Sequence, residues 1–281
     1  MLLCRNTLLC ILALGAGVVG QQTTPISSFE LQTAGAVVPV GAPDLEGWQS
    51  VGGTQVIMPN ATPQSCQSPG SGQWCEISPS TVGPASPVVA PPFPATWPFV
   101  QTPASTVSEM QLSTTAPTVS SGAQVSLKVD WQWFSSELAG SAVYNDFAQI
   151  LLIHQPTNTV VTVMYVDTYH PSFAATNTCT SGVTNLTYTN GTGGPQTATV
   201  PVPACLFGQP VLISVVAANQ GDSSFDSVLF VDNFRWEEVP GLPSVWDRSE
   251  EWCVQPASSI ARPWGIPHQT VMATSSGTMS M

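Results

Sequence analysis

The stretch NQGDSSFDSVLFVDNFRW, residues 219–236, decides the fold of this chain. It begins with turn residues and continues into an almost unbroken apolar run, a pattern that predicts a buried β-strand. With a period of two, one face of that strand carries Val228, Phe230, Asp232, Phe234 and Trp236. Asp232 would then lie among large apolar side chains. Because burial of a carboxylate without a partner is costly, this face predicts a cation or several hydrogen-bond donors beside Asp232.

The rest of the chain repeats the strand pattern at short intervals. Residues 123–134 alternate, and their apolar face consists of Val125, Leu127, Val129, Trp131 and Trp133. Further strands are expected at residues 28–33, 55–58, 110–114, 144–154, 159–167 and 211–218. Glycine and proline turns separate these segments, and no helix of any length is predicted. The expected fold is all-β, an antiparallel β-sandwich of the jelly-roll type with long loops rich in proline and glycine.

The two ends of the chain are expected to lie outside the sandwich. The N-terminus has the pattern of a secretory signal peptide, with Arg5 before an apolar core at 8–19 and small residues before Gln21. That core is too short to span a membrane, and no second span follows. We therefore expect a secreted, extracellular protein. The expected division is a signal peptide at 1–20, a single β-sandwich domain at 21–239 with an irregular proline-rich excursion at 59–105, and an irregular C-terminal tail at 240–281.

The charge of the chain excludes one class of partners. The sequence has 5 Lys and Arg against 17 Asp and Glu, for a formal net charge of −12. A surface this acidic repels phosphate groups, so nucleic acid is not expected as a partner. Removal of the signal peptide leaves Lys128, Arg235, Arg248 and Arg262 as the basic residues. Most carboxylates therefore need solvent or a metal ion, not a basic side chain.

The cysteines after the signal peptide are expected to be oxidised, because disulfides form outside the cell. Cys66 and Cys75 would close a short loop, and Cys179 and Cys205 would join the ends of a long excursion. The connectivity stays open at this point. Cys253 is the odd cysteine, either free or bonded to another molecule.

Three sequons predict a glycoprotein. Asn185 and Asn190 each begin an Asn-X-Thr motif, so residues 184–194 should form an exposed loop. Asn60 begins a third motif, which is weakened by the proline at position 63.

Acidic residues and amides recur where the expected strands end. Ca²⁺ binds about six to eight oxygens from carboxylates, amides and backbone carbonyls. One calcium site is expected at one end of the sandwich, from Glu137, Asn145, Asp146, Asp222 and Asp226. A second would be formed by Glu30 and Asp232. The alternatives are turn hydrogen bonding at Asp222 and Asp226, solvated loops at Glu137 and Asp146, and a salt bridge from Asp232 to Arg235 or Lys128.

The order of several motifs resembles a known family. SEMQLST, SSGAQVSLKVDW, VDWQWFSSEL, YNDFAQILL and GDSSFDSVLFVDNFRW follow one another as in the extracellular β-sandwich domains called choice-of-anchor domains. The resemblance covers residues 109–236, with Phe29 and Glu30 in the place of the first strand. The chain departs from it in the proline-rich excursion, the sequon-bearing loop, the tail and the missing anchor. More broadly, the pattern is similar to jelly-roll carbohydrate-binding modules. That resemblance implies a structural calcium held by a Glu of the first strand and an Asp near the end of the last, here Glu30 and Asp232.

The sequence marks no catalytic set. His154, His170 and His268 are not accompanied by a nucleophile elbow, and no carboxylate pair stands out for glycoside hydrolysis. Aromatic side chains can stack on sugar rings, and Trp97 and Trp48 are the candidates for a ligand-binding role.

These patterns together predict a secreted, non-catalytic module that is stabilised by Ca²⁺. Its expected partners are glycans, extracellular-matrix components or cell-surface components. Two alternatives stay open, namely a purely structural or adhesive glycoprotein and a secreted glycan-active hydrolase.

Overall fold

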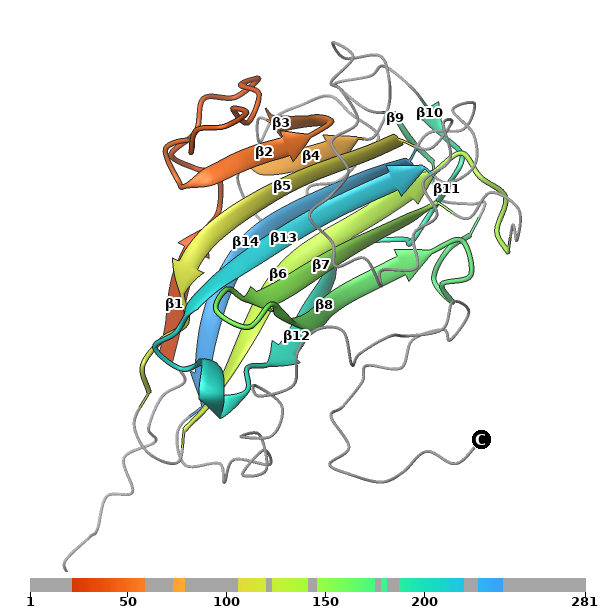
Figure 1. The fold of residues 1–281 in the computed structure, drawn as a ribbon. Coiled ribbons are helices and arrows are strands. Elements are labelled where there is room, and N and C mark those ends of the chain that lie inside the picture. The colour runs from red at the N-terminus through yellow and green to blue at the C-terminus, as the bar shows by residue number, and fades with distance from the viewer. Residues whose placement is uncertain are drawn as a thin grey trace, which may run out of the picture.

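The structure is a computed structural model, and it describes the chain in eight segments. These are residues 22–58, 73–78, 106–119, 123–140, 146–174, 178–180, 187–219 and 227–239. Two antiparallel sheets stack face to face, as Figure 1 shows. The expected all-β sandwich is therefore confirmed. Among the described residues, no helix has the length and apolar character needed to cross a membrane.

Each sheet is assembled from strands that are distant in sequence. The seven-stranded sheet contains β1 (Gln22–Ser27), β3 (Thr54–Met58), β4 (Trp74–Ser78), β6 (Gln124–Ser135), β11 (Asn190–Gly191), β12 (Gln196–Pro201) and β14 (Ser227–Val239). The five-stranded sheet has the order β2 (Trp48–Gly52), β5 (Thr106–Thr115), β13 (Pro210–Asn219), β7 (Phe147–His154) and β8 (Thr159–Asp167). A small separate ladder joins β9 (Cys179–Thr180) to β10 (Thr187–Tyr188), and a short 3-10 turn, η1 (Ala204–Leu206), precedes β13.

Strand β14 organises the seven-stranded sheet. One of its edges pairs with β6 along the whole strand. The other edge pairs first with β4, at Leu229 to Val231, and then with β1, from Phe234 onward. The change of partner coincides with a β-bulge between Asp232 and Arg235, where Asn233 has φ 51°. Asn tolerates this left-handed conformation better than most residues, which suits it to the bulge.

The bulge corrects one prediction from the sequence. On the N-terminal side of the bulge, Leu229 and Val231 point into the main core between the two sheets. On its C-terminal side, Phe234 and Trp236 point into the same core. Val228 and Phe230 belong to a second cluster, with Trp74, Phe134, Cys179 and Tyr188. The five residues predicted to share one face of this strand therefore lie on two faces. An extra residue in a strand reverses the alternation beyond it, and a strict period of two cannot anticipate that reversal.

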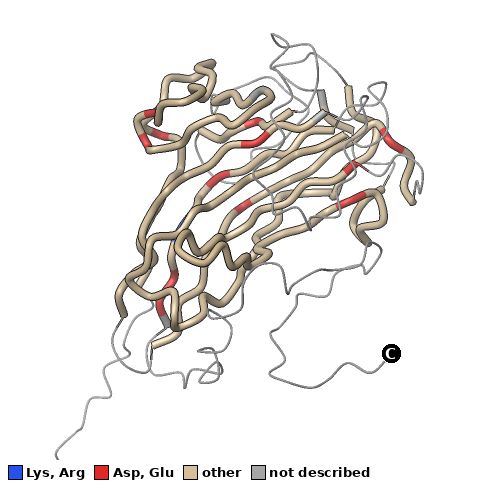
Figure 2. The backbone as a smooth tube through the Cα atoms, viewed as in Figure 1, with Lys and Arg blue, Asp and Glu red and all other residues tan. Residues whose placement is uncertain are grey.

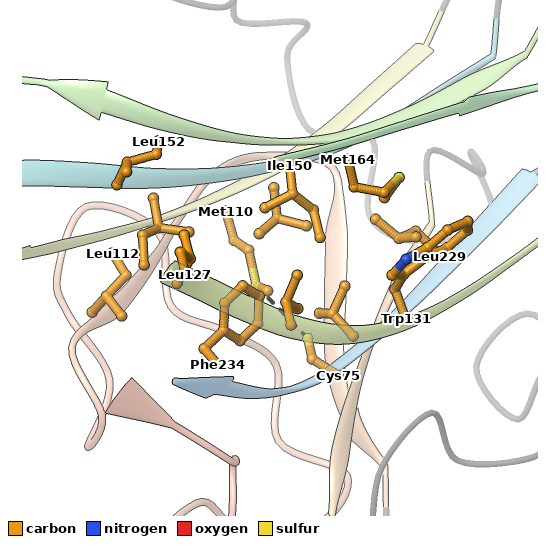
Figure 3. Close-up of a cluster of buried hydrophobic side chains, with 14 of the residues drawn as sticks. Cys75, Met110, Leu112, Leu127, Trp131, Ile150, Leu152, Met164, Leu229 and Phe234 are labelled. Atoms are coloured by element: carbon orange, nitrogen blue, oxygen red, sulfur yellow. Dashed lines mark hydrogen bonds between the residues drawn. The ribbon is translucent and has the colours of Figure 1, made fainter. Parts of the chain in front are cut away.

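The main core fills the space between the two sheets. Met110 and Leu112 from β5 and Ile150 and Leu152 from β7 face Leu127 from β6 (Figure 3). The alternating apolar face predicted for residues 123–134 is confirmed, because all five of its members are buried in this cluster. At about 25 cal/mol per Å² of apolar area, such burial is the dominant stabilising term of the fold.

The N-terminal third differs most from the expectation. The first strand is β1, not residues 28–33, and Phe29 lies beyond it with φ 59° in a turn. The proline-rich excursion contains strand β4, which is inserted between β3 and β14. The expected signal peptide, the expected tail and the remainder of the excursion lie outside the described residues.

Candidate functional site

Asp232 lies at the bulge of β14 and is fully buried. Its Oδ1 accepts a hydrogen bond of 2.6 Å from the backbone N–H of Asn233. Its Oδ2 is buried and has no hydrogen-bond partner. A buried, unpartnered carboxylate oxygen is costly, so this atom marks a place where a proton or a cation is needed.

The charges of three other carboxylates act on Asp232. Burial is the largest cause that raises its pKa, the Asn233 hydrogen bond lowers it, and the charges of Asp130, Glu30 and Glu46 raise it; the net result is a pKa raised from 3.8 to about 8. The charge of Glu30 contributes to this shift, and a calcium site formed by Glu30 and Asp232 stays a prediction. Glu46 was missed, because it follows the first strand in a loop whose path the sequence does not define.

The surrounding acids are held by backbone donors and one arginine. Glu46 accepts hydrogen bonds from the N–H groups of Phe29 and Leu31, both at 3.1 Å, and from the Ser27 hydroxyl. Glu30 Oε1 accepts a hydrogen bond of 2.7 Å from the Gln73 N–H. These bonds fix the carboxylates in place around the turn that follows β1.

The salt bridge considered for Asp232 is not formed with either candidate. Arg235 pairs with Asp130 at 3.2 Å, and Lys128 pairs with Glu237. Figure 2 shows acidic residues in both sheets and at both ends of the sandwich, while Lys and Arg are scarce. A basic side chain therefore does not compensate Asp232 within the part of the chain that the structure describes.

A second acidic site lies where β6 ends. Glu137 and Asp146 are both buried, at 4% and 1% exposure. Ser135 connects them, because its hydroxyl donates to Asp146 Oδ2 at 3.1 Å and accepts from the Glu137 N–H at 3.0 Å. The alternative of solvated loops is therefore wrong for these two residues.

The partners predicted for that second site are only partly placed. Asn145, Asp222 and Asp226 lie outside the described residues. Ser227, which follows Asp226 in sequence, pairs with Ser135 across the sheet. Within the described ranges, no three His, Cys, Asp or Glu side chains converge closely enough to hold a metal ion by themselves.

Trp48 is a core residue, which corrects its prediction as a ligand-binding residue. It is fully buried, and its ring lies 5.0 Å from the ring of Phe234 and 5.9 Å from that of Phe29. Its Nε1–H donates to the Ser27 hydroxyl at 2.9 Å. A side chain enclosed in this way cannot stack on a sugar. Trp97, the other candidate, lies outside the described residues.

Asn190 also differs from its prediction as a glycosylation site in an exposed loop. It lies in β11 at 3% exposure, and its Nδ2 donates to the Glu137 carbonyl at 2.7 Å. The folded protein therefore has no room for a glycan on this nitrogen. Asn60 and Asn185 lie outside the described residues, and their glycosylation stays a prediction.

The cysteines do not follow the predicted pairing. Cys75 is a free thiol in the main core, 3.8 Å from the sulfur of Met110 (Figure 3), so the bond to Cys66 is not formed. Strand β4 directs this side chain between the sheets. Cys179 and Cys205 are each disulfide-bonded. They lie in β9 and η1, at opposite ends of the sandwich (Figure 1), too far apart to be bonded to one another.

We expect non-reducing peptide mapping of the secreted protein to find Cys179 and Cys205 in two separate disulfides. After signal removal, Cys66 and Cys253 are the remaining partners. Cys179 packs in the same cluster as Trp74, which follows Cys66 closely in sequence, so Cys66–Cys179 and Cys205–Cys253 are expected. Cys75 should react with an alkylating reagent only after unfolding. Recovery of a peptide that links Cys179 to Cys205 contradicts this prediction.

A third feature was not predicted from the sequence. The five-stranded sheet has a second side, the outward face, which points away from the main core. This face carries polar side chains in four neighbouring strands of the sheet, β5, β13, β7 and β8. Its members include Glu109, Gln111, Gln149, Tyr165 and Ser214, which alternate with core residues such as Met110, Ile150 and Val215. In register, Glu109, Val216, Gln149 and Tyr165 form one row across four strands.

The polar groups of the outward face form an incomplete network. Glu109 Oε1 accepts hydrogen bonds of 2.7 Å from both Gln111 Nε2 and the Ser214 hydroxyl. Glu109 Oε2 and Gln149 Nε2 are buried and have no hydrogen-bond partner. Burial also raises the pKa of Glu109, against the lowering effect of its two hydrogen bonds. An unused acceptor and an unused donor therefore lie in one row of the sheet.

An aromatic pair lies at the β8 side of the outward face. The rings of Phe147 and Tyr165 stack at 5.9 Å with 22° between their planes. The Tyr165 hydroxyl donates to Asp167 Oδ2 at 3.2 Å, and burial raises the pKa of Tyr165 well above 10. Alternating polar residues at 109, 111 and at 165, 167 were the signal in the sequence that could have revealed this face.

No family model matches the chain, and no curated protein matches it. A Stig cyclase, Fisc from Fischerella sp. TAU, is 10% identical over 77% of this chain and 99% of that chain, with a TM-score of 0.36. A carbohydrate-binding module of type CBM28, described as specific for non-crystalline cellulose, is 9% identical over 71% and 96%, with a TM-score of 0.36. A third structure, from work on carbohydrate-binding modules of the β-sandwich superfamily, is 12% identical over 75% and 61%, with a TM-score of 0.32. Matches this distant assign neither a family nor a ligand.

Proposed function

We propose that this protein is a secreted, non-catalytic β-sandwich module that is stabilised by Ca²⁺ and binds glycans of the cell surface or extracellular matrix. The observation that carries the glycan-binding part is the β8 side of the outward face, where the partly exposed Tyr165 and Asp167 are hydrogen-bonded to one another and the Tyr165 ring stacks on Phe147. Sugar hydroxyls both donate and accept hydrogen bonds, and sugar rings pack on aromatic faces. A sheet face with these groups suits an extended saccharide chain.

The calcium part rests on buried acids without a basic partner. Asp232 has an unpartnered, fully buried oxygen, with Glu30 and Glu46 close enough to raise its pKa. Glu137 and Asp146 are buried together at the other acidic site. Ca²⁺ is bound by carboxylate and carbonyl oxygens, which are the groups present at both sites. Glu30 and Asp232 would contribute carboxylates to one ion, and Glu137 and Asp146, with Asn145, Asp222 and Asp226, would contribute to a second.

Calorimetric titration of the chelator-treated protein with CaCl₂ should show binding, with a rise in thermal stability. Asp232→Asn should weaken Ca²⁺ binding at the site that contains Asp232, and Asp146→Asn should weaken it at the site that contains Glu137 and Asp146. Each variant should raise the Kd of its site roughly tenfold or more, because each replacement removes a charged ligand. Glu238→Gln, a change in the same strand as Asp232, serves as the matched control and should leave Ca²⁺ binding at both sites unchanged. The absence of both binding heat and thermal shift contradicts the calcium proposal.

A glycan array, probed with and without a chelator, tests the binding function. Tyr165→Ala should reduce binding about tenfold, because it removes a partly exposed aromatic ring and its hydroxyl from the proposed site. Gln155→Ala, an exposed residue after β7, should have no effect. Failure of the protein to bind any saccharide, with or without the chelator, leaves a structural or adhesive glycoprotein as the function.

A further inference from the structure

The β1–β2 loop, residues 28–47, concentrates exposed apolar side chains on one part of the molecule. It lies beside β2 and β3 (Figure 1). Six large apolar side chains are exposed in the described ranges, and four of them belong to this loop. The four are 60% to 74% exposed, namely Leu31, Val37, Val40 and Leu45. Clustered exposed apolar side chains on a soluble protein typically mark an interaction site, whereas scattered ones do not.

The exposed surface of the β1–β2 loop is also uncharged over most of its length. No Asp, Glu, Lys, Arg or His occurs between Glu30 and Asp44. Besides the large aliphatic side chains, the exposed residues of this stretch are glycines, alanines, one proline and Thr33. The loop therefore offers water almost no side chain that can be hydrated well.

The carboxylates of Asp44 and Glu46 are turned toward the backbone of the loop. Asp44 Oδ1 accepts hydrogen bonds of 2.9 Å from the N–H groups of Glu46 and Trp48. Glu46 accepts from the N–H groups of Phe29 and Leu31. The charged side chains thus support the loop from within, while its aliphatic side chains face solvent. This arrangement is the reverse of that on most soluble protein surfaces.

The β1–β2 loop is held in this form by both sheets. Phe29 and Val38 are buried in the main core. The Val38 N–H donates to the Gln55 carbonyl of β3 at 3.0 Å, and the Pro39 carbonyl accepts from the Ser50 N–H of β2 at 2.8 Å. Because the loop is bonded to an edge strand of each sheet, it presents its four large aliphatic side chains in a fixed arrangement.

We propose that the β1–β2 loop binds the surface of a lipid bilayer that has zwitterionic headgroups. Its aliphatic side chains would enter the boundary between headgroups and acyl chains, and their removal from water stabilises the contact. The loop backbone stays at the level of the headgroups, because hydrocarbon does not accommodate unpaired N–H and C=O groups. The four side chains together have about as many carbon atoms as one myristoyl chain, so the binding is reversible.

The composition and size of the loop favour lipid over a protein partner. Stable protein interfaces bury roughly 800 Å² on each partner and derive much of their binding energy from tryptophan, tyrosine and arginine. Residues 31–45 contain no aromatic residue, arginine or methionine. Four aliphatic side chains on one loop fall well short of such an area. Two copies of this chain, each with a formal net charge of −12, would also repel one another.

The charge of the protein selects the headgroup. The basic residues of the described part, Lys128 and Arg235, are both paired with acids of the seven-stranded sheet. Anionic lipids would therefore be repelled by the acidic chain. Glu30 is exposed at the start of the loop, and the outermost charge of a phosphatidylcholine headgroup is a quaternary ammonium, which attracts a carboxylate. Phosphatidylcholine is accordingly the expected lipid.

This inference goes beyond the glycan-binding function, and its test needs no saccharide. The protein secreted by expressing cells, in which the expected signal peptide has been removed, is sedimented with phosphatidylcholine vesicles. The wild type should bind these vesicles. Leu31→Ser combined with Leu45→Ser should lower the partition coefficient about tenfold or more, because it removes apolar area from the contact. Val37→Ser combined with Val40→Ser should have a similar effect.

Two controls accompany these variants. Leu138→Ser replaces an equally exposed leucine that follows β6, and it should leave vesicle binding unchanged. Vesicles in which about a third of the lipid is phosphatidylserine should bind the wild type more weakly, because the protein is acidic. Thermal unfolding of all variants should resemble that of the wild type, since the replaced side chains are exposed.

Three results overturn the proposal. One is a wild type that does not bind phosphatidylcholine vesicles, and another is binding that both pairs of serine replacements leave unchanged. The third comes from sedimentation velocity: a wild type that self-associates, with serine variants that are monomeric, would make the loop a contact between copies of this chain. The glycan array judges the glycan-binding function separately, so either can fail while the other stands.

Discussion

Replacing Asp232 with asparagine is expected to stabilise the calcium-free protein at pH 8. In the folded state the pKa of Asp232 is about 8, against 3.8 as its ordinary value. The folded protein therefore holds a proton that the unfolded chain releases above pH 4, and stability falls as the pH rises from about 4 to about 8. This shift corresponds to an upper limit of about 6 kcal/mol. Asparagine keeps an oxygen for the Asn233 N–H and cannot ionise, so the fall should be absent in the variant.

The measurement is urea unfolding of the wild type and Asp232→Asn between pH 4 and pH 8, in the presence of a chelator. The difference between the two proteins isolates Asp232 from other titrating groups, such as Glu109 and His154, whose pKa values are also shifted by burial. Saturating Ca²⁺ should reverse the order at pH 8, because only the wild type has a carboxylate to offer the ion. Parallel pH profiles for the two proteins would show that Asp232 is not buried as described.

The alternation of residues predicted the sandwich because most of its strands bury one side in the main core. Residues 123–134 show this clearly, since their five apolar members are all in that core. The need of Asp232 for compensation was predictable for the same reason, as a charged residue in an apolar strand. The bulge could not be predicted from the sequence. It lies where one edge of β14 changes its partner from β4 to β1, and these strands are far apart in sequence.

The residues that were wrongly predicted share one property, which is that long-range contacts decide their exposure. Asn190 has a sequon in a polar stretch, yet it pairs with Ser135 and is buried. Cys75 lies in a proline-rich excursion, yet the excursion contributes a strand to the seven-stranded sheet. Glu109 was not singled out in the sequence analysis, and only the three-dimensional arrangement shows that both faces of its strand are buried. Such contacts cannot be predicted from the local amino-acid composition.

Truncation of Trp48 to alanine is expected to cost about 3 to 5 kcal/mol of stability, the usual range for a fully buried tryptophan. The ring fills the space between Phe29 and Phe234, and its Nε1–H is bonded to the Ser27 hydroxyl, which in turn donates to Glu46. Loss of the ring therefore leaves a cavity and disturbs a carboxylate beside Asp232. Trp48→Phe should cost less, about 1 to 2 kcal/mol, because it preserves most of the volume and loses one hydrogen bond.

Chemical denaturation of Trp48→Ala, Trp48→Phe and the control Leu45→Ala separates a core role from a binding role. Leu45 lies just before β2, the strand that Trp48 begins, and is 74% exposed, so its truncation should change stability by less than about 0.5 kcal/mol. A sugar-stacking tryptophan would give the opposite pattern, with unchanged stability and lost saccharide binding, and that result would contradict the burial of Trp48. If the core role is correct, Trp48→Ala should also weaken Ca²⁺ binding, since the indole fixes Ser27 and, through it, Glu46. The aromatic core and the acidic site are thus expected to be energetically coupled.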